Sequence, residues 1–91
     1  MEKVILLNSS KTKSGKTAIS YAYSNPKNTY RKGFDVLTQY LEIPDLHDKF
    51  GISDFGKTYE AEFGYVDTYD GQARKIITML ADEKGELIFE L

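Results

Sequence analysis

Strict alternation of large and small side chains in residues 16–24 constrains the fold of this chain more than any other feature of its sequence. Larger residues occupy one set of alternate positions, namely Thr17, Ile19, Tyr21 and Tyr23. Small residues occupy the other set, namely Ala18, Ser20, Ala22 and Ser24. A period of two with β-branched and aromatic residues on one side predicts a β-strand. Pro26 ends this strand because proline cannot donate a hydrogen bond to a sheet ladder.

Residues 34–42 also alternate, and they predict a second strand that pairs with the first. One set of positions contains Phe34, Val36, Thr38 and Tyr40. The opposite set contains Asp35, Leu37, Gln39 and Leu41. A helix is the less favoured alternative for this segment. The polar residues 25–33, which end in Gly33, are expected to form a long hairpin loop between the two strands.

The segments on either side of this hairpin carry signals of their own. Residues 3–7 are a short apolar run, which predicts a strand at least partly buried on both faces, and residues 8–15 are expected to be a polar loop. A single short helix is predicted over about residues 44–50. Pro44 suits its first position, Asp45 and Asp48 its opening turn, and Gly51 its end.

The last third of the chain predicts three more strands, over residues 58–67, 73–80 and 87–89. Gly64 lies inside the first of them and is expected to mark a bulge or a sharp bend. Asp70-Gly71 is a strong hairpin-turn signal, and residues 83–85 form a second turn. The predicted element order is therefore β-β-β-α-β-β with one additional C-terminal strand.

This order predicts an all-β fold with one short helix, as a single domain over residues 1–91. A helix between the third and fourth strands is the layout of the OB-fold, a small barrel that binds oligonucleotides across its second and third strands. We therefore expect an OB-like barrel of five to six strands. A β-meander packed on one helix is the alternative, since the sequence does not determine the strand order.

The aromatic residues are assigned by the faces that they share. The phenylalanines are expected in the core, and they are Phe34, Phe50, Phe55, Phe63 and Phe89. Tyr59 and Tyr65 share a strand face with Phe63 and are expected to be buried or half-buried. Two locations are possible for Tyr21 and Tyr23. They lie either in the core or on a surface that stacks against bases.

Composition narrows the class of protein. The chain has no cysteine, so we expect no disulfide and no thiolate metal site. Its longest apolar runs are far shorter than the roughly 20 residues that span a bilayer, and the first residues do not resemble a signal peptide. These features predict a cytoplasmic protein.

Charge is unevenly placed along the chain, although the net charge is only −2. Residues 1–34 carry seven Lys and Arg residues and one acidic residue, whereas residues 35–91 carry five Lys and Arg residues and thirteen acidic ones. The pattern is consistent with a local basic face on an acidic body, and equally with chance clustering on a solvated surface.

Candidate chemical motifs give little support for an enzyme. Ser14-Gly15-Lys16-Thr17 matches the end of a phosphate-binding P-loop, but a strand-like segment follows it where the motif requires a helix. His47 is the only histidine, and without cysteine it has only carboxylates as fellow metal ligands, so we expect an ordinary helix residue. We therefore expect no catalytic residues, no metal and no cofactor.

Cations and tyrosines alternate between residues 11 and 32. Phosphate-binding cations interleaved with rings that stack on bases are what a single-stranded nucleic acid site requires. The candidate nucleic-acid-binding residues are Lys11, Lys13, Lys16, Tyr21, Tyr23, Lys27, Tyr30, Arg31 and Lys32.

The chain resembles the small helix-destabilising single-stranded DNA-binding proteins of phages and mobile elements. The features that carry the resemblance are the first strand, the SGKTAISYAY segment, the basic loop that ends in Gly33 and the strand that pairs with SGKTAISYAY. The resemblance covers roughly residues 3–41. It implies an OB-like, dimeric protein that coats single-stranded DNA cooperatively and without catalysis during DNA replication. It also implies that Lys13, Lys16, Lys27, Arg31 and Lys32 contact phosphates while Tyr21, Tyr23 and Tyr30 stack on bases.

The alternative function is a protein–protein interaction module, such as a phage or plasmid accessory protein that acts through its acidic face or an exposed strand edge. The sequence leaves the preference for DNA or RNA, the oligomeric state and the pathway open.

Overall fold

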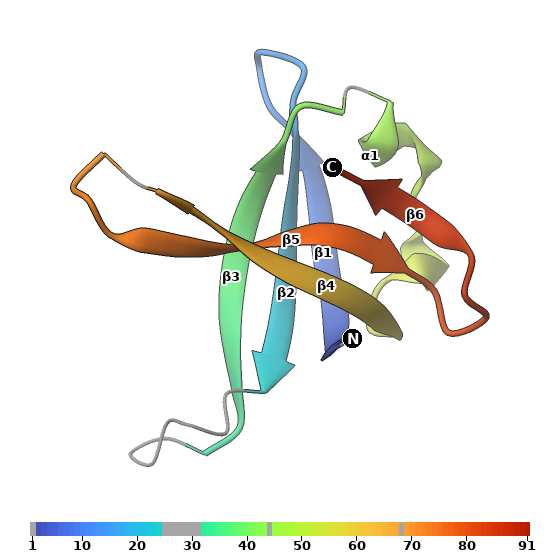
Figure 1. The fold of residues 1–91 in the computed structure, drawn as a ribbon. Helices are drawn as coiled ribbons and strands as arrows, with labels where there is room; N and C mark the ends of the chain where they lie inside the picture. The colour runs from blue at the N-terminus through green and yellow to red at the C-terminus, as the bar shows by residue number, and fades with distance from the viewer. Residues whose placement is uncertain (1, 25–31, 44, 68) are drawn as a thin grey trace. The chain divides into compact units, whose positions relative to one another are not determined.

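The computed structural model describes residues 2–24, 32–43, 45–67 and 69–91 (Figure 1). These residues form mostly antiparallel strands with one short helix, which confirms the all-β class. The elements follow the predicted order. They are β1 (Glu2–Lys11), β2 (Thr17–Ser24), β3 (Phe34–Leu41), α1 (Leu46–Lys49), β4 (Thr58–Asp67), β5 (Ala73–Ala81) and β6 (Leu87–Glu90), with a 3-10 turn at Ile52–Asp54.

The chain divides into two compact units, Val4–Lys57 and Thr58–Leu91, the second of which also includes Met1–Lys3. In the first unit the strand order is β3-β2-β1, and in the second it is β4-β5-β6. All of these pairs are antiparallel. Each unit is therefore built around a three-stranded antiparallel sheet.

β1 is longer than the sequence predicted. Residues 8–11 were expected in a loop, but they continue the ladder until Lys11 pairs with Thr17. A bulge at Leu7 interrupts the register between Leu6 and Asn8. The prediction failed because these residues are polar, yet polar side chains are tolerated where a strand has an exposed face.

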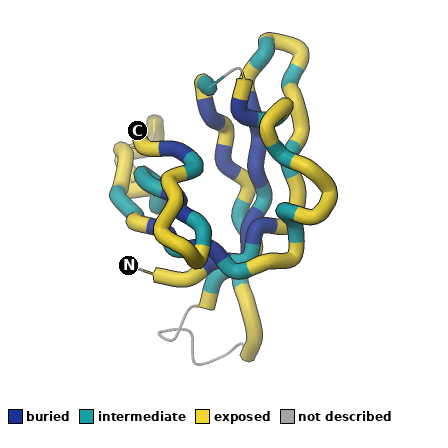
Figure 2. Tube along the Cα trace, turned by 90° about the vertical axis from the view of Figure 1, so that its right-hand side faces the viewer, coloured by how far each residue is buried: buried dark blue, intermediate teal, exposed yellow. Residues whose placement is uncertain are grey.

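The core of the first unit lies on one face of this sheet. Residues with at most 2% exposure are Val4, Leu6, Thr17, Ile19, Tyr21, Leu41 and Leu46. They come from alternate positions of the strands and from α1, and the buried stretches of the chain are dark blue in Figure 2. The larger set of alternating residues in β2 therefore faces the core.

A buried threonine connects β2 to the helical segment. Thr17 Oγ1 donates to the carbonyl of Ile43 at 2.9 Å and accepts from the backbone N–H of His47 at 3.3 Å. The same helix is tied to β1 by a 2.8 Å hydrogen bond between His47 Nδ1 and Ser9 Oγ. α1 is shorter than the predicted span of 44–50, because the backbone is already extended at Phe50. Pro44, the predicted helix start, lies outside the described residues.

The second unit confirms the predicted hairpin of β4 and β5. A bulge between Glu62 and Phe63 lies one step before Gly64, the residue expected to mark it. A Cβ at Gly64 would come within 3.0 Å of the Thr78 side chain, so a close cross-strand approach explains the glycine. The predicted turn at Asp70-Gly71 is confirmed, and Gly71 adopts a φ of 81° that favours glycine.

Burial corrects two of the core assignments. Tyr59 and Phe89 are buried as predicted, with 4% and 5% exposure. Phe34 and Tyr65 are instead 55% and 70% exposed. Phe34 lies on the exposed face of β3, whereas Tyr65 lies in the last part of β4, where the two residues after it are exposed as well. The described helices include none that is long and apolar enough to cross a bilayer.

Candidate nucleic-acid interface

The sheet of the first unit has a second face, opposite the core. In the β2–β3 register, Ala18, Ser20, Ala22 and Ser24 pair respectively with Tyr40, Thr38, Val36 and Phe34. Directly paired residues of antiparallel strands project from the same side of a sheet. We call these eight residues the outer β2–β3 face.

Three large side chains of this face are open to solvent. Phe34, Val36 and Tyr40 have exposed fractions of 55%, 58% and 62%. Each lies beside a small residue of β2, which is too short to cover it. Ala18 and Ala22 are themselves buried, at 6% exposure each, so the open part of this face is the row of side chains on β3. A pair of exposed rings on one strand is a surface on which planar groups can stack.

A polar contact lies between the two rings. Ser20 Oγ and Thr38 Oγ1 are 2.9 Å apart and share a hydrogen bond. This bond occupies one of the two O–H donors. With Val36 beside it, the middle of the face offers fewer hydrogen-bond donors than a specific code for bases needs.

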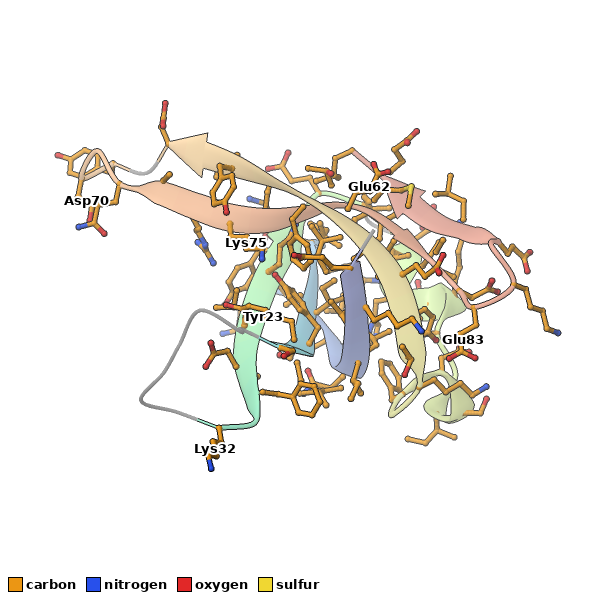
Figure 3. All side chains as sticks on the ribbon, turned by 60° about the horizontal axis from the view of Figure 1, so that its bottom comes forward. Tyr23, Lys32, Glu62, Asp70, Lys75 and Glu83 are labelled. Atoms are coloured by element: carbon orange, nitrogen blue, oxygen red, sulfur yellow. The ribbon has the colours of Figure 1, made fainter. Side chains whose placement is uncertain are left out.

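Lysines lie at both ends of the β2–β3 pair. Lys11, Lys13 and Lys16 surround the turn between β1 and β2, and Lys32 precedes β3 at the other end (Figure 1). Figure 3 shows the side chain of Lys32 extending outward from the chain. The strands between the two ends have eight residues each. At about 3.3 Å per residue, the face spans roughly 26 Å.

Two of these lysines already have carboxylate neighbours. Lys16 Nζ lies 3.1 Å from Glu42 Oε1, and Lys11 Nζ lies 3.7 Å from Asp48 Oδ2. All four side chains are at least 45% exposed. Exposed ion pairs are weak, because water and salt screen them, so a phosphate can exchange with the carboxylate. Lys13 and Lys32 are exposed and have no ion pair recorded within the described residues.

The structure removes Tyr21 from the predicted binding residues. Its side chain is fully buried at 0% exposure, so neither face of its ring is available to a base. Tyr23 lies on the same core-facing side of β2 and is half-buried, with its ring centroid 6.2 Å from that of Tyr21 (Figure 3). Of the two alternatives for Tyr21, the place in the core is correct. Lys27, Tyr30 and Arg31 lie outside the described residues.

Sequence reasoning missed Phe34 and Tyr40 as candidate stacking residues. The alternation of β3 shows that the two rings share one face, but the register that leaves this face exposed is seen only in the structure. Once the larger set of β2 is placed in the core, the residues paired with it, including Leu37 and Leu41, must face the core too. Phe34 and Tyr40 then fall on the exposed side. Asp35 and Gln39 obscured this, because they make the core-facing set of β3 look polar.

The string Ser14-Gly15-Lys16-Thr17 forms a tight turn. The backbone N–H groups of Thr12 and Gly15 donate to the carbonyls of Lys16 and Thr12 at 2.9 and 3.0 Å. β2 begins at Thr17, so a strand follows the glycine, as predicted, where a P-loop requires a helix.

The second unit has a cation–aromatic cluster of its own. Lys75 Nζ lies 4.2 Å from the centroid of the Phe63 ring and 3.3 Å from Glu2 Oε2. These residues and the 70% exposed Tyr65 line a shallow cavity of about 430 Å³. The charge of Lys75 is already balanced by Glu2, and Glu62 adds a further carboxylate to the lining. Lys75 is also only 27% exposed, less than Lys11 and Lys16, so this cluster is a weaker candidate for binding phosphate than the lysines of the first unit.

No known protein family, curated protein or solved structure matches this chain. Its function is therefore inferred from its own residues.

Proposed function

We propose that this protein is a sequence-tolerant, non-catalytic single-stranded DNA-binding protein of a phage or mobile element. The observation that carries the proposal is the outer β2–β3 face, where Phe34 and Tyr40 are exposed between three lysines at one end and Lys32 at the other. Bases stack on the two rings, and the phosphates on either side meet the lysines. This combination of stacking surface and cationic ends is the usual means of binding single strands.

Stacking accounts for the sequence tolerance. Every base has a π-face, so a ring binds any base with a contribution of roughly 1–3 kcal/mol. The Ser20 and Thr38 hydroxyls, which bond to each other, provide little to distinguish one base from another. A duplex hides its base faces inside the stack, so the same surface favours single strands.

The spacing of the rings sets the size of the site. Phe34 and Tyr40 are six residues apart on β3, which corresponds to about 20 Å. A nucleic acid strand that reaches both rings and the lysines at both ends covers several nucleotides, consistent with the range of roughly 4–16 nucleotides that one OB-fold occupies.

An OB-like barrel is the fold that we propose for the whole chain. The helix between β3 and β4 supports it, as does the placement of the candidate interface on β2 and β3. We further propose that the protein acts in the cytoplasm, as a dimer, during DNA replication.

A protein–protein interaction module is the second candidate. The observation that favours it is Ile52, which is 91% exposed in the acidic segment that follows β3. An exposed apolar side chain among carboxylates suits a partner with a basic, partly apolar surface. Such a protein would retain its partner after nuclease treatment and after loss of the Phe34 and Tyr40 rings.

The lysines at the two ends of the face give a prediction about salt. Binding of a labelled mixed-sequence single strand, followed by fluorescence anisotropy, should weaken steeply as salt rises. Each phosphate contact contributes about −0.7 to the slope of log K against log[salt] for a single strand. Lys13→Ala and Lys32→Ala should each weaken binding on all sequences and reduce the magnitude of that slope by about 0.7.

Lys84→Ala is the matched control, because Lys84 is an exposed lysine in the turn before β6. It should leave the slope close to that of the unsubstituted protein. If Lys13→Ala and Lys32→Ala behave like Lys84→Ala, the lysines at the ends of the face do not contact phosphates.

A further inference from the structure

Glu42 lies directly beside the candidate stacking surface. The ladder ends with Ala18 opposite Tyr40 and Thr17 opposite Leu41. One step further along both strands, Lys16 and Glu42 come together with 3.1 Å between Nζ and Oε1. A phosphate that follows a base stacked on Tyr40 would therefore meet Lys16 and Glu42 at once.

The second pair repeats this arrangement on the other side of the same turn. Asp48 on α1 lies 3.7 Å from Lys11 at the end of β1. The Glu42 and Asp48 side chains are 81% and 62% exposed. Exposed carboxylates add little to the stability of a fold. Because they lie beside two lysines that are candidates for binding phosphate, they should affect the affinity for nucleic acid more than the stability of the fold.

We infer that Glu42 and Asp48 are built-in competitors of the nucleic acid phosphates for Lys16 and Lys11. This inference rests on the proposed function. Without a ligand, the carboxylates neutralise the two lysines. A phosphate that binds either lysine must displace its carboxylate and then remains close to a like charge. The protein's affinity for anions at this end is thereby held below what its lysines alone would give.

The competition weakens the binding of every anionic ligand, but only ligands with few other contacts fail to bind. A mononucleotide or a free phosphate gains one contact when it displaces one carboxylate, so its net gain is small. A single strand gains stacking on Tyr40 and Phe34 and several phosphate contacts in one binding event, which outweighs the same displacement. The two carboxylates therefore keep small anions from occupying the lysines, whereas a polynucleotide still binds.

Neutralising the carboxylates provides the test. Across about 4 Å in water, one unit charge pair is worth about a fivefold change in affinity. Glu42→Gln and Asp48→Asn should therefore each tighten binding of the mixed-sequence single strand about fivefold at low salt. The gain should shrink towards one at 1 M salt, where the screening length is about 3 Å. Glu83→Gln, in the turn between β5 and β6, is the control that changes net charge equally.

The outcomes separate this inference from the proposed function. Tighter binding by the Glu42 and Asp48 variants, but not by Glu83→Gln, supports both. Binding by the unsubstituted protein with no gain in these variants overturns the competition and leaves the proposed function in place. A gain that is equal in all three variants also overturns it, because the effect is then one of net charge. Absence of binding in every variant at low salt overturns both.

Discussion

Alanine at Phe34 or at Tyr40 is expected to weaken single-stranded DNA binding by about 5- to 150-fold, the equivalent of the roughly 1–3 kcal/mol that one stacked base contributes. The physical reason is the loss of a ring on which a base rests. Both side chains are more than half exposed, so their removal should change the free energy of unfolding little. Anisotropy titrations measure the first effect and chemical denaturation measures the second.

Ring-conserving substitutions are the controls for this prediction. Phe34→Tyr and Tyr40→Phe keep the aromatic surface and should retain binding within a few-fold of the original. Val36→Ala, on the same face between the two rings, removes apolar area without removing a ring and should have a smaller effect. Equal losses from Val36→Ala and Tyr40→Ala would mean that the face binds through general apolar contact, as a protein partner would require.

Tyr21→Ala should act mainly on stability, unlike the substitutions of Phe34 and Tyr40, and should largely unfold the protein. The side chain is fully buried at the centre of the first unit, opposite Leu6 and Leu37 in the ladder. Truncating a buried aromatic residue typically costs about 3–5 kcal/mol, through lost burial and the cavity that remains. That is much of the 5–15 kcal/mol by which domains are usually stable. Urea denaturation followed by circular dichroism measures the change.

Tyr40→Ala is the matched control for this measurement, because it removes an exposed tyrosine instead of a buried one. Its midpoint of denaturation should stay near that of the unsubstituted protein, while the midpoint of Tyr21→Ala falls sharply. Tyr21→Phe, which preserves the ring, should lose much less stability than Tyr21→Ala. A stable Tyr21→Ala protein that no longer binds single strands would contradict the place of Tyr21 in the core.

The sequence predicted the strands well because their alternation is a local property. The bounds expected for β2, β3 and β4 agree with the structure to within one residue at each end, and the helix and turns occur in the expected places. Alternation also divided β2 and β3 correctly into two sets of side chains. Alternation does not determine which set of β2 side chains shares a face of the sheet with which set of β3 side chains. That depends on the pairing register of the two strands, which a long loop connects.

This ambiguity explains why the sequence left Tyr21 between a place in the core and a place on a binding surface. Tyr21 and Phe34 are both aromatic residues in alternating strands, and nothing local distinguishes a buried ring from an exposed one. The deciding facts are non-local: Tyr21 pairs with Leu6 and Leu37, whereas Phe34 pairs with Ser24. The lysines were easier to place, because charged side chains remain on the surface in either register.

Photochemical cross-linking is the most direct test of the candidate interface. A single-stranded oligonucleotide that carries 5-iodouracil at successive positions would be irradiated with the protein, and the attached peptides identified by mass spectrometry. Stacking on the outer β2–β3 face predicts cross-links at Phe34 and Tyr40, with competition by unlabelled single strand and little by duplex. Cross-links confined to other segments, such as β4 and β5, would contradict the proposed interface even if the protein binds DNA.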